Sequence, residues 1–284
     1  MENYKKLIGS ITIITFSYAA SRLLGFFREI LLANWAGVSE ATDTLDLAFI
    51  IPDFLFYLSA GGYLAITLIP IMSEKKKSEL NNYFLSILYG MSLIFVIFSL
   101  ITYSFRFQFA ELLGVTSLDF FVEVFTPIIF SQVFFFVGAI LMSYQYFHDN
   151  FKYAAIAPVV YNSTIIFFGW INSSTPEGTI KGFAIGTLIG SVLGHFLIQI
   201  YGAKRSGLSF YLISPKFIHI KDYITISLPL ILGQSIAVID EQLFRVFGSF
   251  LAAGSIATFR YARRIALLPV GIVAQAVGVA SYPL

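Results

Sequence analysis

Long apolar stretches alternate with short polar ones along this chain, and they set its predicted architecture. Each apolar stretch has about the 20 residues that a helix needs to cross the hydrocarbon core of a bilayer. Lipid cannot satisfy exposed backbone groups, and these stretches are too long for the tilted strands of a membrane barrel, so we predict helices. The eight predicted spans are Ile8–Ala36, Thr44–Met72, Tyr83–Ser104, Phe120–Phe147, Tyr153–Ile171, Ile180–Tyr201, Tyr223–Leu251 and Ile256–Tyr282.

The composition agrees with an all-α polytopic membrane protein. Of the 284 residues, 57% are hydrophobic and only 12% are charged, and the mean hydropathy is +0.81. The chain has no cysteine, which excludes disulfides and thiolate metal sites. The first apolar stretch contains arginines and lacks a small-residue cleavage site, so we do not interpret it as a removable signal peptide.

The loop cations predict the orientation in the membrane, because Lys and Arg close to helix ends accumulate on the cytoplasmic side. With the N-terminus inside, the opposite side keeps only Arg106 and Lys181. We therefore predict that both ends of the chain are cytoplasmic. The predicted cytoplasmic cations are Lys5, Lys6, Lys75, Lys76, Lys77, Lys152, Lys204, Arg205, Lys216 and Lys221.

Several charged residues remain at membrane depth. Each Arg facing lipid at the bilayer centre would cost about 2.5 to 3.5 kcal/mol, so six would cost on the order of 15 kcal/mol. These side chains must therefore face protein or water. The arginines are Arg22, Arg28, Arg245, Arg260, Arg263 and Arg264, and the acids of the second predicted span and its outer mouth are Asp43, Asp46 and Asp53.

The spacing of these charges places them on shared helix faces. Arg22 and Glu29 are seven residues apart, as are Asp46 and Asp53, and seven residues are nearly two full helical turns. The eighth span carries arginines at i, i+3 and i+4, the spacing of one helix side. Three polar stripes on three helices indicate a shared hydrated cavity. The arginines of the eighth span are Arg260, Arg263 and Arg264.

For the acids, two interpretations remain open. They form internal ion pairs that fix the register of the helices, or they have a direct role in the function of the cavity. For the arginines, ion pairing alone is insufficient, because six of them meet five intramembrane acids. An excess of planar, bidentate cationic donors suits a phosphate or pyrophosphate group. The five acids are Glu29, Asp46, Asp53, Asp240 and Glu241.

An internal repeat links the two ends of the chain. Nine residues separate Arg28 from Gly37 and Arg245 from Gly254, and similar Ser, Ala and Thr positions follow each glycine. The repeat predicts a six-helix N-terminal lobe (1–203), a cytoplasmic linker (204–221) and the first two helices of a second lobe (222–284) that is truncated. Two repeated bundles around a polar cavity are typical of a secondary transporter.

No catalytic constellation accompanies this cavity. The sequence contains no Ser-His-Asp set, no metal-ligand spacing, no P-loop and no dinucleotide-binding fingerprint after a strand. We therefore predict a transporter rather than an enzyme, with no cofactor and no nucleic-acid partner.

Five motifs, in order along the chain, resemble the MurJ/MviN lipid II flippases of the multidrug/oligosaccharidyl-lipid/polysaccharide exporter superfamily. They are "SRLLGFFRE" (Ser21–Glu29), "ATD" (Ala41–Asp43), "IPDFL" (Ile51–Leu55), "APVVYN" (Ala157–Asn162) and "GSFLAAGSIATFRYARRIALLPVGI" (Gly248–Ile272). The resemblance implies two related lobes, usually fourteen helices, a cationic central cavity and alternating access. It implies transport of polyprenyl-pyrophosphate-linked peptidoglycan precursor across the inner membrane.

The resemblance also implies which residues bind substrate. The family's functional positions match Arg22, Arg28, Asp43 and Arg264, while Glu29, Asp46, Asp53, Arg245, Arg260 and Arg263 are further candidate cavity charges. The pattern departs from the family in several places: Phe56 stands where an arginine is usual, Gly61-Gly62 where Glu-Gly is usual, Phe244 where an acid is frequent and Arg263 where Asp or Asn is usual, and Arg260 is additional. Two alternatives follow, a flippase for another lipid-linked oligosaccharide and a non-transporting remnant or scaffold. Enzymes of cell-wall synthesis are candidate partners.

Overall fold

The computed structural model describes residues 20–59 and 64–267, and these residues form helices and no strand. The first helical segment covers residues 20–35 and the last covers residues 255–267. Between them lie α2 (Glu40–Ala48), α3 (Ile50–Ser59), α4 (Leu64–Ser73), α5 (Lys77–Ser104), α6 (Arg106–Leu112), α7 (Leu118–Phe147), α8 (Lys152–Ile171), α9 (Pro176–Gly190), the π-helix η1 (Ser191–Leu197), α10 (Ile198–Arg205) and α11 (Phe217–Gly248).

The predicted spans in the middle of the chain coincide with long helices. By length and composition, four helices of the described part can cross a membrane: Lys77–Ser104, Leu118–Phe147, Lys152–Ile171 and Pro176–Arg205. Helix α11 begins at Phe217, inside the segment predicted as a linker. The ends of the first and eighth predicted spans lie outside the described residues. The described residues therefore form an all-helical structure with four candidate membrane spans, and the number of eight spans stays a prediction.

The second predicted span is not one continuous helix. It begins earlier than predicted, at Glu40, and α2 is separated from α3 by Phe49. The amide of Phe49 is shared between the carbonyl oxygens of Leu45 and Asp46, both at 3.3 Å. Pro52 has no N–H to donate to the carbonyl of Ala48, so the regular ladder fails there. This interruption separates the turns that carry Asp46 and Asp53.

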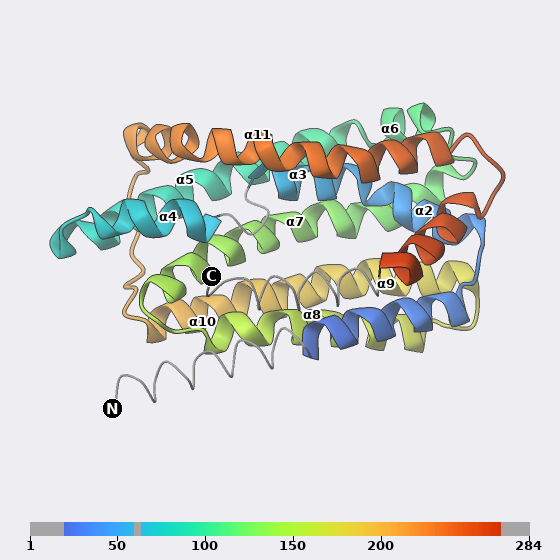
Figure 1. Cartoon of the computed structure of the whole chain (residues 1–284), viewed down its shortest axis with the longest axis horizontal. Coiled ribbons are helices and arrows are strands. Elements are labelled where there is room, and N and C mark those ends of the chain that lie inside the picture. Colours follow the sequence, from blue (N-terminus) through green and yellow to red (C-terminus); the bar gives the residue numbers. More distant parts are fainter. Residues whose placement is uncertain (1–19, 60–63, 268–284) are drawn as a thin grey trace, which may run out of the picture.

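Helix α7 lies at the centre of the bundle (Figure 1). It packs against α2, α3, α4, α5 and α6 on one side and against α9, η1 and α10 on the other. Two apolar cores form around it. One joins α4, α5, α7 and the start of α11 around Phe84 and Phe136, and the other joins the segment 20–35, α2, α7 and α9 around Leu32 and Phe125. The second core supports the charged site.

A stripe of glycines holds α8 against α9 and η1. These glycines recur every four residues and so share one helix face. A Cβ atom added at Gly182 would overlap with the backbone carbonyl of Phe168, and one at Gly194 with that of Ala157. Such small residues let membrane helices approach backbone to backbone, where van der Waals packing replaces the absent hydrophobic driving force. The stripe consists of Gly178, Gly182, Gly186, Gly190 and Gly194.

Gly182→Ala is expected to lower the free energy of unfolding by about 1 to 3 kcal/mol, because the added methyl group must push α9 away from the backbone of α8. Unfolding in mixed detergent micelles, followed by circular dichroism, measures the change. Gly233→Ala is the matched control, since a Cβ at Gly233 in α11 has open space around it. An equal loss in both variants would contradict the role of the stripe.

The two ends of the bundle differ in charge. The turn from α4 to α5, the turn from α7 to α8 and the segment from α10 to α11 lie at the same end (Figure 1). This end collects most of the loop cations, whereas Arg106 and Lys181 belong to the opposite end, where Lys181 pairs with Glu123. The distribution favours a cytoplasmic location for the basic end. The basic end carries Lys75, Lys76, Lys77, Lys152, Lys204, Arg205, Lys216 and Lys221.

Candidate functional site

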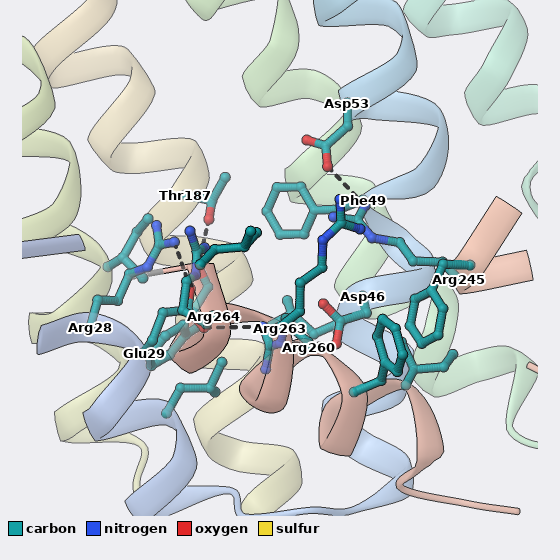
Figure 2. A pocket seen from close by; sticks show the side chains of 18 of the residues that line it. Arg28, Glu29, Asp46, Phe49, Asp53, Thr187, Arg245, Arg260, Arg263 and Arg264 are labelled. Carbon is teal, nitrogen blue, oxygen red and sulfur yellow. Dashed lines mark hydrogen bonds and ion pairs between the residues drawn. The ribbon is translucent and has the colours of Figure 1, made fainter. Parts of the chain in front are cut away.

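A cavity of about 450 Å³ lies among the segment 20–35, α2, α3, α8, α9, α11 and the segment 255–267 (Figure 2). Apolar and aromatic side chains such as Phe183, Phe244 and Phe259 form much of its wall. The charged side chains that line it are Arg28, Glu29, Asp46, Asp53, Arg245, Arg260, Arg263 and Arg264. The structure thus brings together charges from both ends of the sequence, as their spacing predicted.

Glu29 occupies the centre of the charged cluster. Its carboxylate accepts a hydrogen bond from Arg28 at 3.0 Å and lies 3.5 Å from both Arg260 and Arg264. The side chain of Glu29 is only 8% exposed, whereas that of Arg264 is 56% exposed. One buried carboxylate therefore serves three guanidinium groups, and its contact with Arg264 is the most accessible to solvent.

Arg260 bridges two buried carboxylates. Its Nε lies 3.3 Å from Asp46 Oδ2, and its Nη1 lies 3.5 Å from Glu29 Oε2. Neither contact has hydrogen-bond geometry: within the described residues, Arg260 Nε and Nη2, Glu29 Oε2 and Asp46 Oδ2 are buried without a hydrogen-bond partner. Buried polar groups are normally satisfied, so four such atoms around one arginine indicate a cluster that is not at its electrostatic optimum.

A second, shorter ion pair lies across the cavity. Arg245 on α11 donates a hydrogen bond of 2.8 Å to Asp53 on α3, and Arg245 is buried. Figure 2 shows the contact of this pair above Asp46, with Glu29 at the lower left. Arg263 contacts Asp240 at 3.3 Å, where Asp240 is largely exposed. Charge-assisted hydrogen bonds of 2.7 to 2.9 Å are the strong ones, so the Arg245 pair is the firmest of these contacts.

The cavity carries more positive than negative groups. Among the described residues, five arginines and three acids line it, and a fourth acid, Asp240, contacts Arg263 from outside the lining. Internal ion pairs therefore exist, as one interpretation of the sequence held, but three of the arginines share the single carboxylate of Glu29. The lining retains capacity for an anion.

Asp43, the acid predicted at the outer mouth of the second span, binds the start of another helix. Its two carboxylate oxygens accept hydrogen bonds from the amides of Gly254 at 2.6 Å and Ala257 at 2.7 Å. These amides begin the helical segment 255–267, whose first N–H groups have no partner within the helix and favour a negative charge. Asp43 thus joins α2 to the start of the last described helix and does not line the cavity.

Arg22 is also outside the lining of the cavity. It is exposed and lies six residues before Arg28 on the same segment, about 9 Å further along the helix axis. Of the four residues that the family resemblance assigns to substrate, the structure therefore brings Arg28 and Arg264 together in the cavity and places Asp43 and Arg22 beside it.

Asp43→Ala is expected to lower the free energy of unfolding by about 0.5 to 2 kcal/mol, since two amides at the start of segment 255–267 lose their acceptor. Thermal unfolding in detergent measures the loss. Glu40→Ala serves as the control because it removes an exposed carboxylate from the same helix. Indistinguishable curves for Asp43→Ala and wild type would mean that the cap contributes nothing.

The structure adds polar neighbours that the sequence reasoning did not select. Asn162 on α8 accepts a hydrogen bond from Arg28 at 3.2 Å, and Tyr161 and Thr187 line the cavity. Asn162 belongs to the motif "APVVYN", where a polar amide within an apolar helix was the available signal. Among the described residues, no group of three or more histidine, aspartate or glutamate side chains is arranged to hold a metal ion.

Comparison with known proteins identifies the family of this chain. The family model described as "Lipid II flippase MurJ" matches residues 32–284. The chain belongs to the MurJ family. This match covers the elements that form the cavity from Leu32 onward and leaves out residues 20–31, which include Arg28 and Glu29. The resemblance drawn from the motifs is confirmed. Its members are multi-pass membrane transporters of bacteria rather than enzymes.

Individual MurJ proteins show the same likeness. The lipid II flippase MurJ of Thermosipho africanus is 32% identical over 65% of this chain and 40% of its own length. A probable lipid II flippase MurJ of Buchnera aphidicola is 27% identical over 95% of this chain and 54% of its own. A solved MurJ in an inward closed conformation is 27% identical, with a TM-score of 0.76 over 92% of this chain and 55% of that one. The chain spans about half the length of the relatives it matches.

Proposed function

We propose that this chain is part of a flippase that moves a polyprenyl-pyrophosphate-linked glycan, lipid II, across the bacterial inner membrane. The single observation that carries the proposal is the surplus of arginines over acids in the lining of the 450 Å³ cavity. Arginine side chains within a membrane are costly and usually face a protein interior or a water-filled cavity. A cluster of them around one cavity therefore indicates a functional site. A pyrophosphate supplies the missing negative charge, and guanidinium groups bind phosphate oxygens bidentately.

The contacts around Glu29 suggest where the pyrophosphate binds. Arg260 and Arg264 lie 3.5 Å from Glu29, whereas Arg28 is hydrogen-bonded to it at 3.0 Å. The longer contacts are the easier ones to exchange, and Arg264 is the most exposed of the three. We therefore assign Arg264 and Arg260 to the pyrophosphate, with Arg28 held in place by Glu29 and Asn162. Each charge-assisted hydrogen bond to the ligand contributes about 1.5 to 3 kcal/mol.

The cap made by Asp43 suggests how one end of the cavity closes. It holds the start of segment 255–267 against α2, and Gly254 packs against Val38 there. The solved relative is described as inward closed. In an alternating-access cycle, breaking these contacts would open the cavity at the end opposite to the basic one. With the basic end in the cytoplasm, that opening faces outward.

Reconstitution tests the proposal directly. Vesicles that contain the chain and fluorescent lipid II are expected to lose inner-leaflet fluorescence to an external quencher faster than empty vesicles. A matched lipid that carries polyprenyl monophosphate without the glycan is the specificity control. Faster movement of a capsule-type lipid-linked oligosaccharide than of lipid II would assign the chain to that other substrate. Equal rates with and without the chain would overturn the proposal.

A further inference from the structure

The charged cluster around Arg260 contains a buried carboxylate, Asp46, whose protonation depends on where Arg260 binds. We propose that binding of a pyrophosphate in this cavity is coupled to protonation of Asp46, so that the site takes up one proton with its anion. The inference rests on the proposed function, because it needs an anion that competes for Arg260. It concerns the charge state of the site rather than the identity of the substrate.

The two carboxylates beside Arg260 differ in their other partners. Glu29 also holds a hydrogen bond from Arg28 and a contact with Arg264, so it keeps cationic neighbours when Arg260 moves. Asp46 contacts Arg260 at 3.3 Å through Oδ2, and this oxygen is buried without a hydrogen-bond partner. The side chain of Asp46 is 5% exposed, so water does not replace the lost cation easily. Asp46 is thus the acid most dependent on Arg260.

An incoming pyrophosphate draws Arg260 away from Asp46. Phosphate oxygens accept two parallel hydrogen bonds from one guanidinium. Two buried nitrogen atoms of Arg260, Nε and Nη2, make no hydrogen bond in the structure and can donate to the ligand. Once Arg260 turns to the ligand, an ionised Asp46 would remain buried beside a new negative charge. Burial and a neighbouring like charge both favour the neutral carboxylic acid. A proton from solvent then binds to Asp46.

The other charged groups near Asp46 do not remove this need. Arg245 also acts on Asp46, but its short hydrogen bond of 2.8 Å goes to Asp53, and Asp43 on the same helix as Asp46 is a like charge. The charged residues of α7 and the first turn of α9 lie near the helix ends and away from the cavity. The groups that face Asp46 are Arg260 and Tyr261 from segment 255–267, Arg245 from α11, Glu29 from segment 20–35 and Asp43 from α2.

Isothermal titration calorimetry measures the proton count. The purified chain in detergent is titrated with inorganic pyrophosphate at about pH 7.5 in buffers of different ionisation enthalpy, and the slope of heat against that enthalpy gives the protons taken up per anion bound. The wild type is expected to take up about one proton more than Asp46→Asn, because the protonation of pyrophosphate itself is common to both. Asp240→Asn, which removes an exposed carboxylate, is expected to match the wild type.

Inorganic sulfate is a second probe, since its charge does not change in this pH range. Proton uptake by the wild type on sulfate binding supports the inference without relying on the variant. Equal uptake by wild type and Asp46→Asn with pyrophosphate, or no uptake with bound sulfate, overturns the inference and leaves the anion site standing. If the wild type binds no pyrophosphate at all, the proposed function fails, and the inference fails with it.

Discussion

Arg264→Ala is expected to reduce lipid II flipping by about 10- to 150-fold, with little effect on stability. The reduction corresponds to the loss of about 1.5 to 3 kcal/mol from one charge-assisted hydrogen bond to the pyrophosphate. Stability should hold because the side chain is 56% exposed and lies 3.5 Å from Glu29, and exposed ion pairs contribute about 0 to 1 kcal/mol. Arg264→Ala is thus the substitution expected to lower the flipping rate strongly while leaving the free energy of unfolding nearly unchanged.

The measurement is the initial flipping rate in vesicles, normalised to the amount of folded protein inserted. Lys181→Ala is the matched control, since it removes a cation from the opposite end of the bundle, where Lys181 pairs with Glu123. Arg264→Lys keeps the charge but loses the planar fork of donors, and we expect an intermediate rate. A normal rate for Arg264→Ala would exclude this arginine from the pyrophosphate site.

Hydropathy and charge spacing are local properties of the sequence. They therefore predicted the helices and the polar helix faces that indicated a cavity. The heptad spacing of Arg22 and Glu29 correctly placed them on one helix, but spacing fixes the face and not the depth along the axis. Arg22 therefore stays a predicted substrate residue that does not line the cavity, while Arg28, about 1.7 helical turns further on, does line it.

The partners of the charges could not be read from the sequence, since they depend on contacts between distant segments. Asp43 binds amides 211 and 214 residues away, and backbone amides leave no signature in residue type. Arg260 was recognised only as an additional cation, yet the structure places it between Glu29 and Asp46. The interruption of the second span at Phe49 follows from Pro52, which the sequence contained but which does not always break a helix.

Arg260→Met is expected to be the most destabilising single substitution in the cavity, at about 3 to 5 kcal/mol. Removing one member of a buried ion pair leaves the other charge uncompensated, and this penalty is far larger than the net contribution of the pair. Here two buried carboxylates, Glu29 and Asp46, would both lose Arg260. Unfolding in mixed micelles measures the loss, and Arg264→Met, a more exposed arginine beside the same Glu29, should cost under about 1 kcal/mol.

A second substitution distinguishes lost charge compensation from lost packing. In the double variant Arg260→Met with Asp46→Asn, the carboxylate that depends most on Arg260 is neutral, so a large part of the stability should return. The coupling between the two sites is expected at about 1 to 3 kcal/mol in a double-mutant cycle. If the two effects are simply additive, the role of Arg260 is steric, and the electrostatic account of the cluster around Glu29 and Asp46 does not hold.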